Sequence, residues 1–275
     1  MGTNHSIERI NTTSHASAFL NLNDPAIESR LAVDGAALPI RVLIGVCTFN
    51  EASNIGPLLS RLRKSIPEAD IVVVDDNSPD GTASRVRDAM ETDDKIHLVV
   101  REHERGLGGA ILHAISVAID ADSEFFLNLD ADLSHSPEQL AELLALARHR
   151  PDVDVVVGSR YVDGGKIEGW PLRRRVMSRM LNRFGTIGLG LPVRDCSGSM
   201  RCYRVESLRK LDFDGLKSRG YALLEELLVH LNSRGSKMAE VPITFVDRQQ
   251  GESKLTIGEA LRSVSQMLKL AASRR

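Results

Sequence analysis

The sequence predicts an α/β protein with a mainly parallel, Rossmann-like sheet and helices on both of its faces. From residue 41 onward, short apolar runs of strand length alternate with segments whose apolar residues recur at helical spacing. The chain has 275 residues, of which 42% are hydrophobic and 26% charged, as in ordinary globular proteins. A chain of this length and composition can bury a large core without disulfides.

The strands are predicted from buried-type runs of Val, Ile, Leu and Phe. In chain order they lie at residues 42–46, 71–74, 96–100, 125–129, 153–157, 200–203 and 238–245. The helices are predicted from apolar residues three and four apart, as in Ile55, Leu58, Leu59 and Leu62. They lie at residues 55–66, 82–90, 108–121, 137–149, 173–188, 222–234 and 256–270. The last helix is amphipathic, and it either lies in a membrane interface or packs on the sheet as core.

We expect a flexible leader at residues 1–38 and a single folded domain at residues 39–275. The leader is rich in Ser, Thr, Asn and Ala and has no sustained apolar period. No apolar stretch approaches the roughly 18 residues needed to span a bilayer, and the N-terminus lacks the pattern of a secretory signal. We therefore expect a cytoplasmic protein without a transmembrane domain, whose contact with a membrane would be peripheral.

Charge and cysteine content exclude two classes of protein. The 35 Lys and Arg residues against 37 Asp and Glu give a formal net charge of −2, without the basic excess of nucleic-acid-binding proteins. The three cysteines, Cys47, Cys196 and Cys202, form no CxxC pair, which fits neither a disulfide framework nor a zinc ribbon. We expect no nucleic-acid partner and a reducing compartment.

Acidic side chains follow three of the predicted strands. Asn50 and Glu51 follow the first strand, Asp75 and Asp76 the second, and residues 130–132 (DAD) the fourth. Because ligands bind outside the carboxyl ends of the strands in open α/β sheets, these clusters should converge on one functional edge. Their mutual repulsion must be offset by a cation or by hydrogen-bond donors.

Asp130 and Asp132 are candidate metal ligands. In an extended segment, residues two apart point to the same side with Cα atoms roughly 6.5 Å apart, so one cation can reach both carboxylates. Mg²⁺ or Mn²⁺ would take its remaining ligands from phosphate oxygens and water, as in a nucleoside-diphosphate site. The alternative is that the pair only caps the next helix, although Ser136 before Pro137 already occupies the N-cap position.

Four further segments are open to two interpretations each. Residues 77–81 (NSPDG) are a turn before a helix, and they either do no more than turn the chain or take part in the functional site. Residues 105–109 (RGLGG) are a close-packed turn or a ligand contact, and they have neither of the two phosphate-loop spacings. The run 173–175 (RRR) is an anion site or a solvated helix face, and Trp170 is a loop anchor or a membrane-interface residue. Arg160, which directly follows a strand, could meet a phosphate with its guanidinium group.

Together the motifs resemble one known family over residues 41–270. They are 48–51 (TFNE), 75–82 (DDNSPDGT), 130–135 (DADLSH), 158–161 (GSRY), 168–172 (EGWPL), 241–248 (VPITFVDR) and 251–255 (GESKL). In combination they are similar to the dolichol-phosphate or polyprenol-phosphate mannosyltransferases of glycosyltransferase family 2. The resemblance implies a GT-A fold, with a nucleotide-binding half at about 39–160, an acceptor half at about 161–255 and a C-terminal amphipathic helix at about 256–270.

The resemblance also implies an activity and its partners. The protein would transfer mannose, with inversion, from GDP-mannose to a polyprenyl or dolichyl phosphate at a membrane surface, assisted by Mg²⁺ or Mn²⁺. The nucleotide-sugar would contact Cys47, Phe49, Glu51, Val74, Asp76, Asp130, Ala131, Asp132, Arg248 and Lys254. Asp130 and Asp132 would hold the metal, and Arg160 and Arg174 the acceptor phosphate. The catalytic candidates are Asp132, Arg160 and, as a weaker acid candidate from the family pattern GYxxxxE, Glu226.

Departures from the family pattern leave two alternative functions open. Cys47 and Phe49 stand where the family usually has Pro and Tyr, and residues 195–201 (DCSGSMR) replace a common DPTSGFR. One alternative is a family 2 transferase that uses a UDP-sugar, glucose or an amino sugar, with polyprenyl phosphate. The other is a non-catalytic subunit that binds a nucleotide-sugar.

Overall fold

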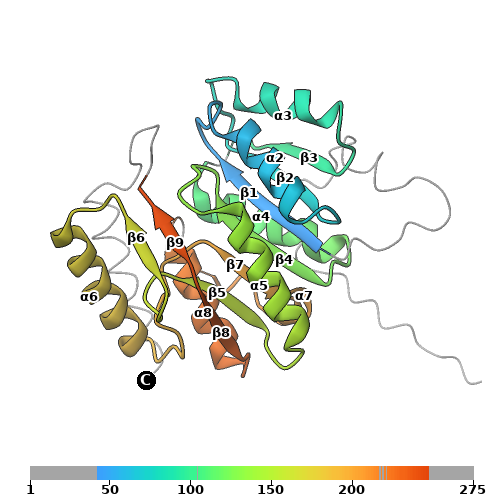
Figure 1. Cartoon of the computed structure of the whole chain (residues 1–275). Helices are drawn as coiled ribbons and strands as arrows, with labels where there is room; N and C mark the ends of the chain where they lie inside the picture. Colours follow the sequence, from blue (N-terminus) through green and yellow to red (C-terminus); the bar gives the residue numbers. More distant parts are fainter. Residues whose placement is uncertain (1–41, 104, 217, 219, 221, 248–275) are drawn as a thin grey trace, which may run out of the picture.

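A seven-stranded sheet forms the centre of the protein in a computed structural model that describes residues 42–103, 105–216, 218, 220 and 222–247 (Figure 1). Its strand order is β3-β2-β1-β4-β7-β5-β8. These strands are β1 (Val42–Thr48), β2 (Asp70–Asp75), β3 (Ile96–Val100), β4 (Phe125–Asp130), β5 (Val155–Ser159), β7 (Arg201–Arg204) and β8 (Met238–Pro242). The expected leader and the expected helix 256–270 lie outside the described residues.

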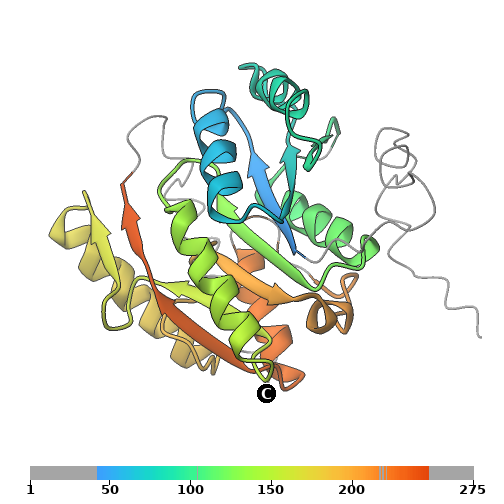
Figure 2. The same ribbon diagram turned by 45° about the vertical axis from the view of Figure 1, so that its right-hand side comes forward.

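The helices cover both faces of this sheet, as predicted (Figures 1 and 2). They are α2 (Ile55–Ser65), α3 (Thr82–Met90), α4 (Leu107–Asp120), α5 (Pro137–His149), α7 (Val205–Arg209) and α8 (Ala222–Ser233), whereas α6 (Leu172–Gly188) lies at the flank of the molecule (Figure 1). Apolar residues of α2, α3 and α5 share one core with alternate strand residues such as Ile44 and Ile71. Those of α4, α7 and α8 share a second core with residues such as Leu43 and Val72. Since neighbouring strand residues point to opposite faces, the buried strands separate two cores.

The sheet is mainly parallel, but it contains one antiparallel strand. β7 runs antiparallel to both of its neighbours, β4 and β5, while the pairs β1·β2, β1·β4, β2·β3 and β5·β8 are parallel. Hydrophobic periodicity carries no information about strand direction. The sequence pattern therefore predicted where this strand lies in the chain but not that it runs antiparallel.

The prediction of one strand at 238–245 is wrong, because the chain leaves the main sheet at Pro242. β8 ends there, and β9 (Thr244–Val246) pairs with β6 (Lys166–Glu168) in a separate two-stranded sheet. Ile243 joins the two sheets: its amide donates to the Ser159 carbonyl, and its carbonyl accepts from the Lys166 amide. β6 and the five-residue α7 are too short for the periodicity to reveal.

The central strand β1 contacts α4 closely through Gly45. A Cβ atom at this position would lie 2.8 Å from the Phe126 ring and 2.9 Å from Cβ of Ala114. The absence of a side chain at Gly45 therefore sets how closely α4 approaches the sheet. Among the described residues, no helix has the length and apolar character needed to cross a membrane.

Candidate active site

The acidic strand ends converge at the carboxyl edge of the sheet, as predicted. β2, β1 and β4 are adjacent and parallel, and Cys47 of β1 pairs with Val74 on one side and Asp130 on the other. Burial and the neighbouring Asp76 and Asp130 charges raise the pKa of the Cys47 thiol, which therefore stays neutral. The structure thus gathers the expected acidic residues around the end of β1.

Two of the carboxylates in residues 75–82 hold the loop itself. Asp75 is fully buried and accepts hydrogen bonds from Thr48 Oγ1 (2.7 Å), the Ser78 amide (2.8 Å) and Ser78 Oγ (2.6 Å). Asp80 accepts from the Ala52 and Thr82 amides, each at 3.0 Å. The expected turn is confirmed, and it connects the loop after β2 to the loop after β1.

Asp76 faces the segment 105–109 instead of the turn. The Gly106 amide donates to Asp76 Oδ2 (2.6 Å), and Arg101 Nη1 lies 3.3 Å from Oδ1. Burial raises the pKa of Asp76, against the lowering effect of these two contacts. The guanidinium of Arg105 lies 5.5 Å from the centre of the Phe49 ring. The glycine-rich segment therefore contacts two of the expected nucleotide-binding residues.

The remaining expected nucleotide contacts are placed in different ways. Glu51 is buried, and its carboxylate accepts from Asn54 Nδ2 (2.8 Å). Val74 and Ala131 belong to the two hydrophobic cores, so their side chains pack inward. Arg248 and Lys254 lie outside the described residues.

Asp130 and Asp132 lie at and just beyond the end of β4. The Asp130 side chain is 26% exposed, whereas Asp132 is buried and its Oδ1 accepts hydrogen bonds from the amide (3.0 Å) and hydroxyl of Ser134. Ser136 occupies the N-cap position of α5, but its hydroxyl contacts the Glu138 carboxylate and makes no capping hydrogen bond.

The donor set at this edge fits a cation that shares its ligands with a phosphate. In the described part of the chain, no three His, Cys, Asp or Glu side chains gather in a way that could hold a metal ion. Two carboxylates with hard oxygen donors still match Mg²⁺ or Mn²⁺, which commonly bind one or two carboxylates and complete their shell with diphosphate oxygens and water.

His135 is a buried neighbour of Asp130 whose position no sequence pattern indicated. Its Nδ1 lies 3.7 Å from Asp130 Oδ2, and its ring meets Phe245 edge-on at 5.1 Å between centres. Neither ring nitrogen has a hydrogen-bond partner among the described residues. Burial lowers the pKa of His135, against the raising effect of Asp130. The imidazole is therefore neutral near pH 7.

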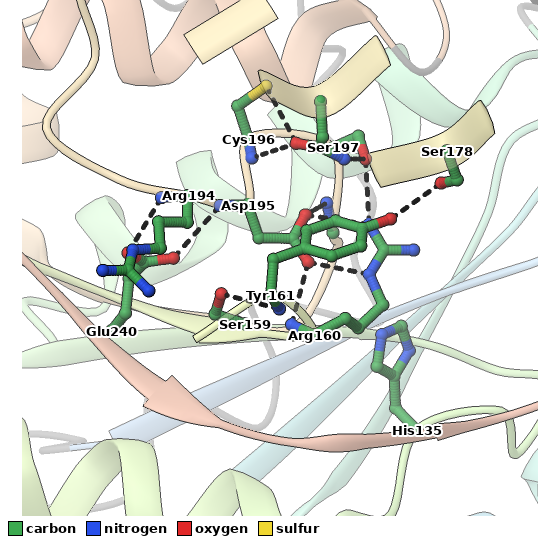
Figure 3. Close-up of polar contacts among 12 residues, drawn as sticks. His135, Ser159, Arg160, Tyr161, Ser178, Arg194, Asp195, Cys196, Ser197 and Glu240 are labelled. Carbon is green, nitrogen blue, oxygen red and sulfur yellow. Dashed lines mark hydrogen bonds and ion pairs between the residues drawn. The ribbon is translucent and has the colours of Figure 1, made fainter. Parts of the chain in front are cut away.

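Arg160, the expected phosphate-binding arginine, is buried in an ion pair with Asp195 (Figure 3). Its Nε and Nη2 donate to the two carboxylate oxygens at 2.7 and 2.8 Å, and Nη2 also donates to Ser197 Oγ at 2.9 Å. Burial acts to raise the pKa of Asp195, but the Arg160 charge and hydrogen bonds hold it below its usual range. The paired carboxylate fixes the guanidinium in one orientation.

An aromatic cluster connects Arg160 to Arg174. The Phe245 ring centre lies 5.5 Å from the Arg160 guanidinium and 5.3 Å from the Trp170 ring. Trp170 Nε1 donates to Asp247 (3.0 Å), and Arg174 lies over the indole at 4.0 Å and 3.5 Å from the same carboxylate. Trp170 therefore anchors its loop, as one of the two interpretations predicted.

The acid candidate Glu226 and its neighbour Glu225 face different groups. Glu226 accepts from the Ser218 amide (2.7 Å) and lies 3.8 Å from His230 Nε2. Burial raises the pKa of Glu225 to about 7, and this carboxyl group senses the charges of Arg201, Asp195 and Arg160. The structure thus places Glu225 in the electrostatic neighbourhood of Arg160, a position that the family pattern did not indicate.

The mixed α/β sheet, with helices on both faces and Asp130 and Asp132 at and beyond the end of the strand beside β1, is a GT-A-like fold. Residues 43–212 match the family model "Glycosyl transferase family 2". The chain belongs to this family, and it is a glycosyltransferase.

Curated relatives share both sequence and length with the chain. It is 38% identical over 229 residues to the undecaprenyl-phosphate mannosyltransferase of Micrococcus luteus, covering 82% of this chain and 93% of the relative. It is 35% identical over 230 residues to the polyprenol monophosphomannose synthase of Mycolicibacterium smegmatis, covering 82% and 86%. The solved structure of mannosyl-3-phosphoglycerate synthase from Rubrobacter xylanophilus matches with a TM-score of 0.61 at 21% identity, covering 86% and 74%, which supports the fold.

Proposed function

We propose that the protein transfers mannose from GDP-mannose to a polyprenyl phosphate, with inversion and with assistance from Mg²⁺ or Mn²⁺. The observation that carries the proposal is the similarity to two relatives across 82% of the chain, since both relatives are named for joining mannose to a polyprenyl phosphate. The acidic carboxyl edge and the fixed Arg160 support the proposal, because they would supply a cation site and a positive charge for this reaction.

The reaction needs no strong base at the acceptor. A phosphate monoester is already anionic near neutral pH, and one of its oxygens can attack the anomeric carbon from the face opposite the leaving nucleoside diphosphate. The charge that develops on the leaving group must be stabilised by fixed cationic groups. A divalent cation held by Asp130 and Asp132 would supply Lewis-acid stabilisation of the diphosphate.

Some residues of the chain would bind the sugar donor, and others would bind the lipid acceptor. On the donor side, Phe49 offers a ring face, and Asp76 with the Gly106 amide fixes the neighbouring loop. On the acceptor side, we assign the lipid phosphate to Arg160 and Arg174, which the Phe245 and Trp170 rings connect. Glu226, Arg248 and Lys254 stay predictions from the family pattern. The lipid acceptor implies peripheral attachment to a membrane.

Transfer of labelled mannose from GDP-mannose to undecaprenyl phosphate in detergent, with Mn²⁺ or Mg²⁺ and an EDTA control, tests the proposal. We expect a lipid-linked mannose product that EDTA abolishes. Parallel reactions with UDP-glucose and a UDP-linked amino sugar test the donor. A product from a UDP-sugar alone would overturn the GDP-mannose assignment, and a product unaffected by EDTA would overturn the role of the metal.

A further inference from the structure

Helix α6 exposes its large apolar side chains to solvent. In the part of the chain that the structure describes, the exposed large hydrophobic side chains all belong to this helix, and they are 47–71% exposed. They are Leu172, Val176, Met177, Met180, Leu181, Phe184 and Ile187. Figures 1 and 2 both show α6 at the outer flank of the molecule, beside the β6–β9 ribbon. A contiguous apolar stripe of this kind marks an interaction surface.

The opposite side of α6 attaches the helix to the protein through polar side chains. Ser178 Oγ lies 2.7 Å from the Tyr161 hydroxyl, Asn182 Nδ2 donates to Ser197 Oγ (2.6 Å), and Asn182 Oδ1 accepts from the Cys196 amide (2.8 Å). At 3.6 residues per turn, these positions fall opposite the apolar ones. α6 therefore reverses the usual orientation of a surface helix, which buries its apolar face.

Basic residues accompany the exposed apolar face. α6 carries five arginines, at 173, 174, 175, 179 and 183, and no acidic residue. Residues 248–275, which lie outside the described structure, contain six basic and two acidic residues, so their charge would repel α6. A second copy of α6 packed symmetrically on this face would bring five more arginines to it. The headgroup region of an anionic membrane offers α6 both apolar volume and opposite charge.

We propose that the outer face of α6, formed by the seven apolar residues named above and accompanied by the arginines of the same helix, docks on the headgroup region of a bilayer that contains anionic lipids. The apolar side chains enter the interface, and the arginines meet lipid phosphates. The inference deepens the proposed function and rests on it in one respect, because a lipid acceptor is what brings the enzyme to a bilayer.

The attachment side of α6 is connected directly to the expected acceptor site. Ser197 Oγ accepts from Asn182 of α6 and from Arg160 Nη2 at the same time. Arg179 and Arg160 also lie over the same ring of Tyr161, at 5.8 and 5.2 Å. A helix held at the headgroup level would therefore fix Arg160 relative to the membrane surface, where the phosphate of a lipid acceptor lies.

Flotation of the full chain with phosphatidylcholine vesicles, with and without phosphatidylglycerol and without donor or acceptor, tests the docking. We expect binding that requires phosphatidylglycerol. The double variant Arg173→Gln/Arg183→Gln should lower the vesicle partition coefficient on the order of tenfold, and Met180→Ser/Phe184→Ser by at least as much. The matched control Arg85→Gln/Arg87→Gln removes two exposed arginines from α3 and should bind like the unsubstituted chain. Undiminished binding of both α6 variants would overturn the proposal.

A second measurement distinguishes other occupants of the face. A Phe184→Cys variant is labelled with an environment-sensitive dye, with the unsubstituted chain labelled in parallel as background. We expect labelling in vesicle-free solution and a blue shift when phosphatidylglycerol vesicles are added. A thiol that resists labelling in solution would mean that the chain's own C-terminal segment or a second copy covers the face. Light scattering of Met180→Ser/Phe184→Ser then separates these two cases, and either result would refute a free membrane-docking face.

Activity in the absence of vesicles separates this proposal from the proposed function. With a short-chain, water-soluble prenyl phosphate, the α6 variants should transfer mannose at the rate of the unsubstituted chain. Normal vesicle binding without any transfer would contradict the proposed function and leave the docking face standing. Transfer that falls together with vesicle binding in this soluble assay would contradict the assignment of α6 to docking.

Discussion

Asp130 and Asp132 differ in exposure although only one residue separates them. Asp130 is about a quarter exposed at the sheet edge, whereas Asp132 is buried and bonded to Ser134. The bonds from Ser134 fix Asp132 Oδ1, so the orientation of this carboxylate is set before any ligand arrives. Such preorganisation favours a carboxylate that acts through a bound cation.

Asp132→Asn should lower turnover on the order of a hundredfold, because a neutral amide replaces the charge that a hard cation requires. The stabilisation of the protein by Mn²⁺ together with GDP, measured by thermal melting, should also be lost. Asp163→Asn, a change of the same kind at an exposed loop position, is the control and should behave like the unsubstituted chain. Near-normal turnover of Asp132→Asn would refute the metal role.

Glu225 should make stability depend on pH. Burial raises its pKa to about 7, and its Oε2 has no hydrogen-bond partner among the described residues, while Arg201, Asp195 and Arg160 supply the neighbouring charges. A raised pKa means that the folded state holds the proton more tightly than the unfolded state. The resulting stabilisation is complete below the unfolded pKa, near 4.5, and is lost as the pH rises through about 7.

Glu225→Gln should remove this loss. The variant should exceed the unsubstituted chain by about 2 kcal/mol in free energy of unfolding at pH 8 and show no such advantage at pH 5. Urea denaturation at both pH values measures the difference. Parallel pH profiles for the two proteins would contradict the buried, proton-holding role of Glu225.

The sequence predicted the residues that directly follow strands and missed their partners. Asp130 and Arg160 were found because a strand end is a local signal. Asp195 lies 35 positions from Arg160, and no local pattern connects the two. His135 and Phe245 belong to two of the family motifs, but no local pattern predicts that their rings meet across the isolated bridge between the two segments. Contacts between residues this far apart in the sequence depend on the order of the strands in the sheet. Hydrophobic periodicity gives no information about that order.

At the scale of elements, β1 depends on the small size of Gly45. Gly45→Ala should lower the free energy of unfolding by about 2 kcal/mol, because the added Cβ would overlap the Phe126 ring and Ala114. Gly56→Ala is the matched control, since a Cβ at this position of α2 meets no atom within 4 Å, and alanine favours helices. Chemical denaturation measures both. Equal effects of the two substitutions would contradict the close packing of α4 on β1.

Element prediction succeeded where segments were long and strongly periodic. The helices α2 to α6 and the strands β1 to β5 lie within a few residues of their predicted bounds. β6, β9 and α7 have three, three and five residues, too few for a period to repeat. Pro242 lacks an amide hydrogen and so favours the end of a strand, which is where β8 ends. The continuous apolar run around Pro242 nevertheless led to the prediction of a single strand.

At the scale of the whole molecule, donor binding should stabilise the fold. The proposed nucleotide site draws on loops after β1, β2 and β4, so a bound ligand connects three neighbouring strands. A ligand that binds only the folded state at about 100 times its Kd adds roughly 2.7 kcal/mol. At about 2–4 °C per kcal/mol for a domain of this size, this corresponds to a rise in Tm of about 5–11 °C.

GDP with Mn²⁺ should therefore raise Tm by about 5–11 °C at saturating concentration, and EDTA should reverse most of the rise. UDP at the same concentration serves as the comparison in the same melting experiment. A larger shift with UDP than with GDP would favour a UDP-sugar donor and contradict the proposed GDP-mannose specificity.

The antiparallel insertion of β7 has a consequence for the order of folding during synthesis. β3, β2, β1 and β4 find all of their mutual partners within residues 42–130, so this half of the sheet can assemble while the remainder is still on the ribosome. β5 ends at Ser159 but cannot join the growing sheet until β7, which begins at Arg201, has emerged between it and β4. Pulsed hydrogen exchange should show protection of β1–β4 amides before those of β5 and β8, and simultaneous protection would contradict this order. The donor-side edge would then be the older half of every newly made molecule, and the acceptor side would be completed around it.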